Sequence, residues 1–168
     1  MTIVHPTQEM HVTNNDILRR IRYSFDFDDS KMIKLLSLPD QPVSREQMSE
    51  WLKKDDDPEF QLCKDEQLAI FLNNLIDENR GKKEGAQPQL EKHLTNNIIL
   101  RKLKIALDLR DDDIITLMEL ADFKISKHEL SALFRKKGHK HYRACKDQIL
   151  RNFLQGMQLK YRKKDYYK

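Results

Sequence analysis

The sequence contains too few of the residues that several protein classes require. Two cysteines in 168 residues cannot form a disulfide framework, so we expect a reducing, cytoplasmic setting. Four glycines and five prolines exclude a collagen-like or linker-rich chain and argue against a turn-rich β-sandwich. No apolar run approaches the ~20 residues of a membrane helix, and the first residues lack the layout of a signal peptide. The sequence therefore predicts a cytoplasmic protein without a membrane partner.

The residues that are abundant are apolar and charged ones. Apolar residues make up 39% of the chain, which is enough for a globular core. Charged residues make up 35%, well above the usual share of about a quarter, so most of the surface must be ionic. A chain of this length accommodates one ordinary domain or two small ones.

The strongest signal is an internal duplication. The segment NNDILRR at 14–20 recurs as NNIILRK at 96–102, an offset of 82 residues. Holding that offset without a gap from residue 14 to 76 gives 20 identities in 63 pairs. The matches include Cys-Lys-Asp at 63–65 and 145–147 and Phe-Leu at 71–72 and 153–154. The chain therefore carries one unit twice.

Each copy has the apolar spacing of four helices, and no useful length alternates with the period of a strand. The fold class predicted is all-α, a tandem duplication of a four-helix module. Capping preferences indicate where the helices begin. The residues expected to open them are the asparagine pairs (Asn14, Asn15, Asn96, Asn97), the acidic clusters at 28–29 and 111–113, the serines Ser44 and Ser126, and the aspartates Asp65 and Asp147.

The same patterns divide the chain into five segments. The stretch around residues 79–88 holds two of the four glycines and a proline, which marks a hinge between the copies. The predicted segments are an N-terminal extension at 1–13, a first repeat at 14–81, a linker at 82–95, a second repeat at 96–158 and a basic tail at 159–168.

Charge separates two copies that the apolar pattern makes alike. Residues 1–81 hold 10 Lys and Arg against 16 Asp and Glu, whereas residues 82–168 hold 21 against 11. From residue 135 onward there are 12 basic and 2 acidic residues, with tyrosines interleaved. This composition suits a phosphate backbone and exposed bases. The candidate RNA- or DNA-binding residues are Arg135, Lys136, Lys137, Lys140, Arg143, Lys146, Lys160, Arg162, Lys163 and Lys164.

The second and third helices of each copy also resemble a helix-turn-helix. In that interpretation Arg45, Gln47, Lys127 and His128 would lie near the start of a recognition helix. The aspartates at 55–57 and Glu59 follow the third helix of the first copy and would repel phosphates. Nucleic-acid binding is therefore expected of the second copy alone.

An acidic module joined to a basic one supports an alternative partner. The copies could dock on each other, or on neighbouring molecules head to tail, with residues 55–59 near residues 135–146. A protein-interaction or self-association module is thus the second hypothesis.

No pattern in the sequence indicates an enzyme, a cofactor or a metal site. Cys63 and Cys145 are expected to be buried packing residues, because the first copy offers no histidine base at a matching position. His139 and His141 lie near Cys145, but the flanking cations oppose metal binding, so we expect them to face solvent or phosphate. Trp51 lies on the core stripe and is expected to pack there.

The duplicated motifs Asn-Asn-x-Ile-Leu-Arg, Cys-Lys-Asp and Phe-Leu resemble those of the YehS-like family, a duplicated all-helical bacterial family of unknown function. The resemblance covers roughly residues 14 to 160. It implies a small bacterial cytosolic protein, and it transfers no activity and no catalytic residues.

Overall fold

A computed structural model describes residues 11–82 and 89–162, and within these ranges the chain is helical. The predicted all-α class is confirmed: apart from one isolated bridge between Leu38 and Gln41, the described residues form eight helices and connections. No helix among them is long and apolar enough to span a bilayer. The helices are α1 (Asn14–Phe25), α2 (Asp29–Leu36), α3 (Arg45–Leu52), α4 (Asp65–Arg80), α5 (Asn96–Ala106), α6 (Asp111–Leu120), α7 (Lys127–Leu133) and α8 (Asp147–Tyr161).

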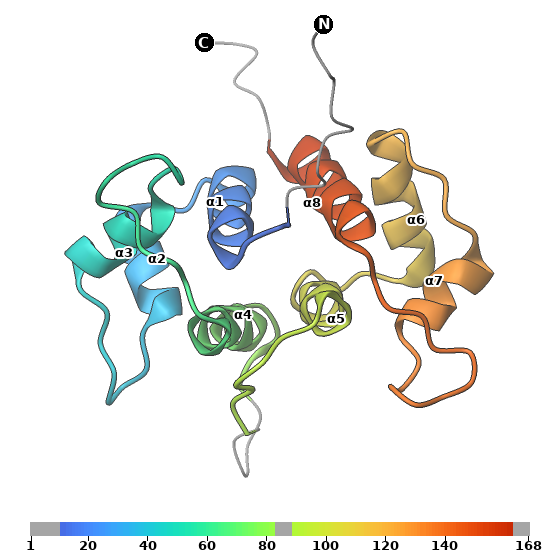
Figure 1. Cartoon of the computed structure of the whole chain (residues 1–168), viewed down its shortest axis with the longest axis horizontal. Helices are drawn as coiled ribbons and strands as arrows, with labels where there is room; N and C mark the ends of the chain where they lie inside the picture. Colours follow the sequence, from blue (N-terminus) through green and yellow to red (C-terminus); the bar gives the residue numbers. More distant parts are fainter. Residues whose placement is uncertain (1–10, 83–88, 163–168) are drawn as a thin grey trace, which may run out of the picture.

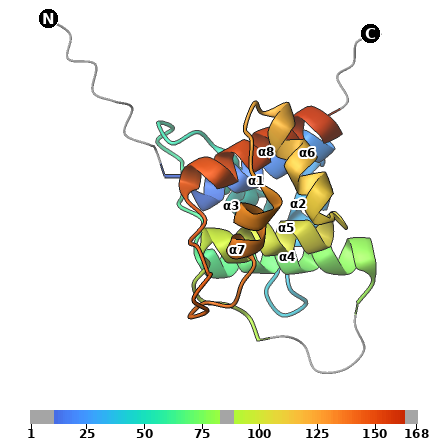
Figure 2. The same cartoon turned by 90° about the vertical axis from the view of Figure 1, so that its right-hand side faces the viewer.

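The two copies pair about a pseudo-two-fold axis. In Figure 1 a half-turn in the plane of the picture carries α1–α4 onto α5–α8. Helices α1, α4, α5 and α8 form the centre, where α1 packs on α8 and α4 packs on α5. The α2–α3 pair covers one side and the α6–α7 pair covers the other. In Figure 2 the neighbours α4 and α5 again run side by side.

Reciprocal contacts at the ends of α4 and α8 fasten the copies together. Arg80 Nη1 lies 3.2 Å from Asp108 Oδ1, and its repeat counterpart Arg162 lies 3.2 Å from Asp26 Oδ1. Both aspartates have a positive φ at the turn that ends a helix, Asp26 at 53° and Asp108 at 52°. Each ion pair therefore joins the last helix of one copy to the turn that ends the first helix of the other copy.

The helices begin close to where the sequence indicates, but the asparagine caps expected for α1 and α5 are wrong. The caps of α1 and α5 are Thr13 and Thr95, whose side chains accept from the backbone N–H of Asp16 and Ile98. The asparagine pairs that follow them lie inside the helices. Ser44 and Ser126 cap α3 and α7 as predicted, accepting from Gln47 and Glu129.

Asp65 and Asp147 do not cap α4 and α8 either, because each is the first residue of its helix. Their carboxylates instead accept hydrogen bonds from two other segments of the chain. Each accepts from an asparagine of its own copy, Asn14 or Asn96, at 2.8 and 2.7 Å. Each also accepts from the segment that leads into the other copy's first helix. The Leu94 N–H donates to Asp65 at 2.8 Å, and His11 Nδ1 lies 2.8 Å from Asp147.

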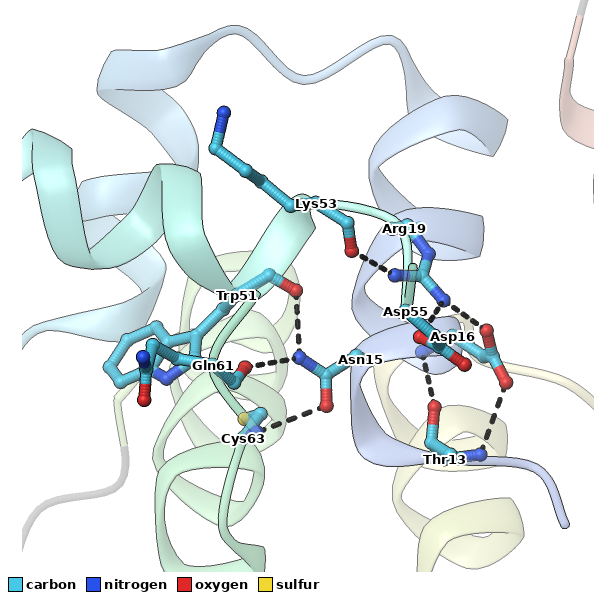
Figure 3. A network of polar contacts seen from close by, with 9 residues as sticks. All are labelled: Thr13, Asn15, Asp16, Arg19, Trp51, Lys53, Asp55, Gln61 and Cys63. Carbon is cyan, nitrogen blue, oxygen red and sulfur yellow. Dashed lines mark hydrogen bonds and ion pairs between the residues drawn. The ribbon is translucent and has the colours of Figure 1, made fainter. Parts of the chain in front are cut away.

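The second asparagine of each pair is a buried clamp, which Figure 3 shows for the first copy. Asn15 is fully buried, and its Nδ2 donates to the carbonyl oxygens of Trp51 and Gln61 at 2.9 and 2.8 Å. Its Oδ1 accepts from the Cys63 N–H at 3.0 Å. Asn97 repeats all three bonds, at 2.8–2.9 Å, to Leu133, Arg143 and Cys145. The clamp therefore fixes both ends of the loop that follows the third helix.

The core is continuous through both copies, with Phe71 and Phe153 fully buried at repeat-equivalent positions. Trp51 is partly buried against this core, and both cysteines are buried in it, as predicted.

The two copies differ where the fourth helix of each copy packs on its second helix. Asn74 Nδ2 donates to the Leu35 and Ser37 carbonyls. In the second copy the counterpart is Gly156, where an added Cβ would lie 1.9 Å from the Leu117 oxygen.

The Asn97 clamp generates the first prediction. Replacing Asn97 with Ala leaves two carbonyls and one N–H at the base of the loop without their partner, so the free energy of unfolding should fall by about 2–4 kcal/mol. Urea unfolding followed by far-ultraviolet circular dichroism measures this change. Asn152→Ala on the half-buried face of α8 is the control and should shift the value by less than about 0.5 kcal/mol. Equal effects of the two variants would contradict the clamp.

Candidate functional site

The loop between α7 and α8 gathers most of the predicted nucleic-acid-binding residues. We call residues 135–146 the basic loop. Its six cationic side chains are exposed, and none has a carboxylate within ion-pair distance among the described residues. This loop is therefore a cationic surface that the described part of the chain does not neutralise. The six residues are Arg135, Lys136, Lys137, Lys140, Arg143 and Lys146.

Backbone hydrogen bonds give the basic loop a defined shape. The His139 N–H donates to the Lys136 carbonyl at 2.9 Å, and the Tyr142 N–H donates to the His139 carbonyl at 2.9 Å. The Arg143 N–H reaches the Ala132 carbonyl at 3.0 Å, and the Asn97 clamp holds the Arg143 carbonyl. Gly138, within the first turn, has a positive φ of 98°. The cations therefore project from a fixed scaffold.

The first copy builds the same scaffold with the opposite charge. The Asp57 N–H donates to Lys54, the Phe60 N–H to Asp57 and the Gln61 N–H to Glu50, each bond offset by 82 residues from its partner in the basic loop. The segment at 55–59, which we call the acidic segment, carries three aspartates and Glu59. The two loops thus share these backbone hydrogen bonds, although Asp56 lacks the positive φ of its counterpart Gly138, and they differ in the charge of their side chains.

The acidic segment and the basic loop lie at opposite corners of the molecule, upper left and lower right in Figure 1. The expectation that the copies dock by bringing these two regions together within one chain is therefore wrong. The copies pack instead through α1 on α8 and α4 on α5. A head-to-tail contact between molecules is geometrically different and is not affected by this result.

The C-terminal candidates do not join the basic loop. Figure 1 shows the end of α8 at the top, away from the loop at the lower right. Lys160 is exposed there, but Arg162 is paired with Asp26 and lies 4.4 Å over the Tyr23 ring. Tyr161 packs on Phe25 with a centroid distance of 5.1 Å, so its ring is not free to stack on a base. Lys163 and Lys164 lie outside the described residues.

The four residues proposed for a helix-turn-helix contact are exposed, but the two helices of each candidate motif are joined by a long connection. Residues 37–44 link α2 to α3, and residues 121–126 link α6 to α7. Such a motif ordinarily has a turn of about three or four residues. Arg45 is also engaged in an ion pair with Asp29 at 2.8 Å, whereas Lys127 and His128 make no ion pair among the described residues.

The two thiols are held in their protonated form. Burial raises the pKa of Cys63 and of Cys145 to about 12, and the nearby carboxylates of Asp65 and Asp147 add to the effect. A thiolate is the reactive form of cysteine, so neither side chain is prepared to act as a nucleophile near neutral pH.

The histidines of the basic loop pair with each other. The His139 and His141 rings lie 5.5 Å apart between centroids, and His139 Nδ1 accepts from the His141 N–H at 3.0 Å. Across the described residues, no group of three or more His, Cys, Asp or Glu side chains is placed to hold a metal ion.

Sequence reasoning missed a second cluster of cationic side chains, at the interface where α1 packs on α8. Arg20 and Arg151 both line a cavity there. The signal was present in the alignment of the copies, because Arg151 stands opposite Ala69 and Gln158 opposite Ile76. The second copy has a charged and an amide side chain at positions where the first copy has apolar ones. The packing of the shared core does not require this difference.

The buried thiols generate a prediction about reactivity. At pH 7.5 the folded protein should react with a disulfide reagent such as dithionitrobenzoate on the order of a hundredfold more slowly than the urea-unfolded chain, because the thiolate is scarce and shielded. The rate should rise only as the pH approaches the raised pKa. Cys63→Ser and Cys145→Ser assign the signal to each site, and rapid labelling of either thiol in the native protein would contradict the packing role.

Comparison with known proteins agrees with the duplicated architecture. The chain is 42% identical to the uncharacterized protein YehS of Escherichia coli (strain K12) over 146 residues, which covers 86% of this chain and 93% of that protein. No solved structure matches the chain. A family model described as a protein of unknown function, DUF1456, matches twice, at residues 14–81 and 96–163. The chain therefore belongs to the DUF1456 family and contains two copies of its repeat.

Proposed function

We propose that this protein is a non-enzymatic helical binding protein that contacts the phosphate backbone of RNA or DNA through its basic loop. The observation that carries the proposal is the set of six exposed cations without a carboxylate partner among the described residues. Exposed cations attract phosphates over about 8–10 Å at physiological salt, and release of counterions adds to the affinity.

The fixed shape of the loop favours binding. The Asn97 clamp and the turn bonds at His139 and Tyr142 hold the backbone before any partner arrives. Binding then orders only side chains, which costs about 0.5–1.5 kcal/mol for each long side chain instead of the larger cost of ordering a loop.

The contact is directed at the backbone and not at base sequence. The tyrosine of the loop, Tyr142, is half-buried, and Tyr161 packs against the core. The connection at 121–126 is longer than a helix-turn-helix turn, so we assign Lys127 and His128 to a peripheral role beside the loop. Phosphate contacts of this kind position a protein on nucleic acid without reading its sequence.

A second candidate is head-to-tail association of copies of this chain. The observation that favours it is that one loop scaffold occurs at opposite corners with opposite charge. A basic loop of one molecule facing an acidic segment of the next would form a heterologous contact, which repeats along a row of molecules unless it closes. Complementary charge would set the orientation of such a contact.

The nucleic-acid proposal is tested by reversing two charges in the basic loop. Lys136→Glu with Lys146→Glu should weaken binding of a fluorescent duplex about tenfold or more, since two phosphate contacts become repulsive. Fluorescence anisotropy at several salt concentrations gives the affinity. For the unaltered protein, a log–log salt slope of about −5 is expected if all six cations reach phosphates.

The repeat supplies a matched control. Lys54→Glu with Lys64→Glu makes the same change in net charge at the equivalent positions of the first copy, where the side chains are also exposed. This pair should weaken binding less than about threefold, because these residues lie at the other corner of the molecule. Equal weakening by both pairs would show that net charge alone governs binding and would refute the assignment to the basic loop.

Self-association is tested in the absence of nucleic acid. If it occurs, light scattering at low salt should show a mass that grows with protein concentration and returns to one chain at about 0.5 M salt, because screening weakens exposed charge pairs. Asp56→Lys with Glu59→Lys should abolish the growth. Mixing this variant with Lys136→Glu/Lys146→Glu should restore a mass of at least two chains, because the unaltered basic loop of the first variant can meet the unaltered acidic segment of the second. A single-chain mass at all concentrations would eliminate this candidate.

A further inference from the structure

The first helix of each copy carries an arginine at the same repeat position, Arg19 on α1 and Arg101 on α5. Each donates to the carbonyl of the residue that ends the third helix of its copy. The acceptor is Lys53 for Arg19 and Phe134 for Arg101. Because the loop to the fourth helix starts there, Arg101 stands beside the basic loop, although Phe134 is 33 residues away in sequence.

In the first copy the cations at this position are neutralised by carboxylates of the same copy. Arg19 pairs with Asp16, one turn earlier in α1, and its Nη2 lies 3.4 Å from Asp55 Oδ1 (Figure 3). Lys53 Nζ lies 3.5 Å from Glu59 Oε2. Three carboxylates thus pair with two cations, and an external anion is repelled there.

The second copy keeps both cations and replaces all three carboxylates. The cations are Arg101 and Arg135, and the positions of the carboxylates are taken by Ile98, Lys137 and His141. The side chains of Arg101, Arg135 and Lys137 are exposed, and none of the three has an ion-pair partner among the described residues. The described part of the second copy therefore presents three cations where the first copy is neutralised internally.

Phe134 holds the guanidinium of Arg101 in a defined position. Its ring packs against the core, and Lys104 Nζ, which is paired with Asp111, lies 4.4 Å from the centre of that ring. The Phe134 carbonyl takes one donor of Arg101, whereas a guanidinium has five. A guanidinium that is oriented in advance loses less conformational freedom when a partner binds.

We propose that Arg101, Arg135 and Lys137 bind one backbone phosphate of the nucleic acid, which takes the position that carboxylates occupy in the first copy. The inference rests on the proposed function and adds to it a residue of α5 and one defined contact. A phosphate supplies the negative charge that the second copy lacks here, and its oxygens match the fork of a guanidinium as a carboxylate does. Lys137, at the position of Asp55, removes the internal competitor and adds a further positive charge.

Three variants that each make the net charge more negative by one test the site by anisotropy of the fluorescent duplex. Arg101→Gln should weaken binding about five- to tenfold at about 0.1 M salt and reduce the log–log salt slope by about 0.9, because one phosphate contact is lost. Ile98→Asp should have a similar effect, because it gives Arg101 the carboxylate that Arg19 has. Arg19→Gln is the matched control and should change the affinity less than about twofold, since it lies in the other copy.

A fourth variant separates a phosphate contact from a role in shaping the loop. Arg101→Lys keeps the cation, so it should retain the salt slope and lose less than about threefold in affinity. Circular dichroism of each variant confirms that it is folded. Weaker binding of Arg101→Gln with an unchanged salt slope would show that Arg101 only supports the loop, and would overturn the proposal.

The remaining outcomes distinguish this site from the proposed function. If Lys136→Glu/Lys146→Glu weakens binding and Arg101→Gln changes neither affinity nor slope, the basic loop contacts nucleic acid and the Arg101 site is refuted. If none of these variants alters binding, the proposed function fails and this inference fails with it. A mass of the chain alone that grows with concentration and is abolished by Arg101→Gln, with unchanged affinity for the duplex, would assign the site to the acidic segment of a second copy and would also overturn the proposal.

Discussion

The buried asparagine clamp is the interaction on which the rest of the structure depends. The loop after the third helix of each copy has backbone groups that face the core and find no partner in a helix. Asn15 and Asn97 each hydrogen-bond three of these backbone groups through a single side-chain amide, which presents two donors and one acceptor in one plane. Leaving even one such group unpaired costs about 1–3 kcal/mol, so the amide determines where α1, α3 and α4 meet. The same holds for α5, α7 and α8.

Because the clamp binds backbone and not side chains, it leaves the exposed residues of each loop free to vary. The turn bonds at 54–61 and 136–143 are the same, while Asp55, Asp57 and Glu59 occupy the positions that Lys137, His139 and His141 occupy in the second copy. A duplicated unit can in this way keep its packing and reverse the charge of its surface. The central packing of α1 on α8 and α4 on α5 then holds the two loops at opposite corners.

The sequence predicted the helices and the duplication well, because apolar spacing and repeated motifs report local structure and shared cores. It misassigned the asparagines because a capping preference is local, whereas the partners of Asn15 lie 36 to 48 residues away. It grouped Arg162 with the basic surface because charge was counted along the chain, although Asp26 of the other copy pairs with it in space. It also stopped the repeat at residue 14, although Pro6, Glu9, His11 and Thr13 match Pro88, Glu91, His93 and Thr95. Contacts across the pseudo-two-fold axis are not encoded in either copy alone.

Departures from internal symmetry identify the positions where the two copies differ in packing or in charge. The core positions Phe71 and Phe153 match because both copies need the same volume. Gly156 departs from Asn74 for a steric reason, since the α6 backbone comes too close for any Cβ. Arg151 in place of Ala69 changes the charge: Ala69 is buried, whereas Arg151 donates to the Gln148 amide oxygen at 3.0 Å and lines a cavity with Arg20. The α1–α8 contact therefore differs from the α4–α5 contact in charge, although the same pseudo-two-fold axis relates the two contacts.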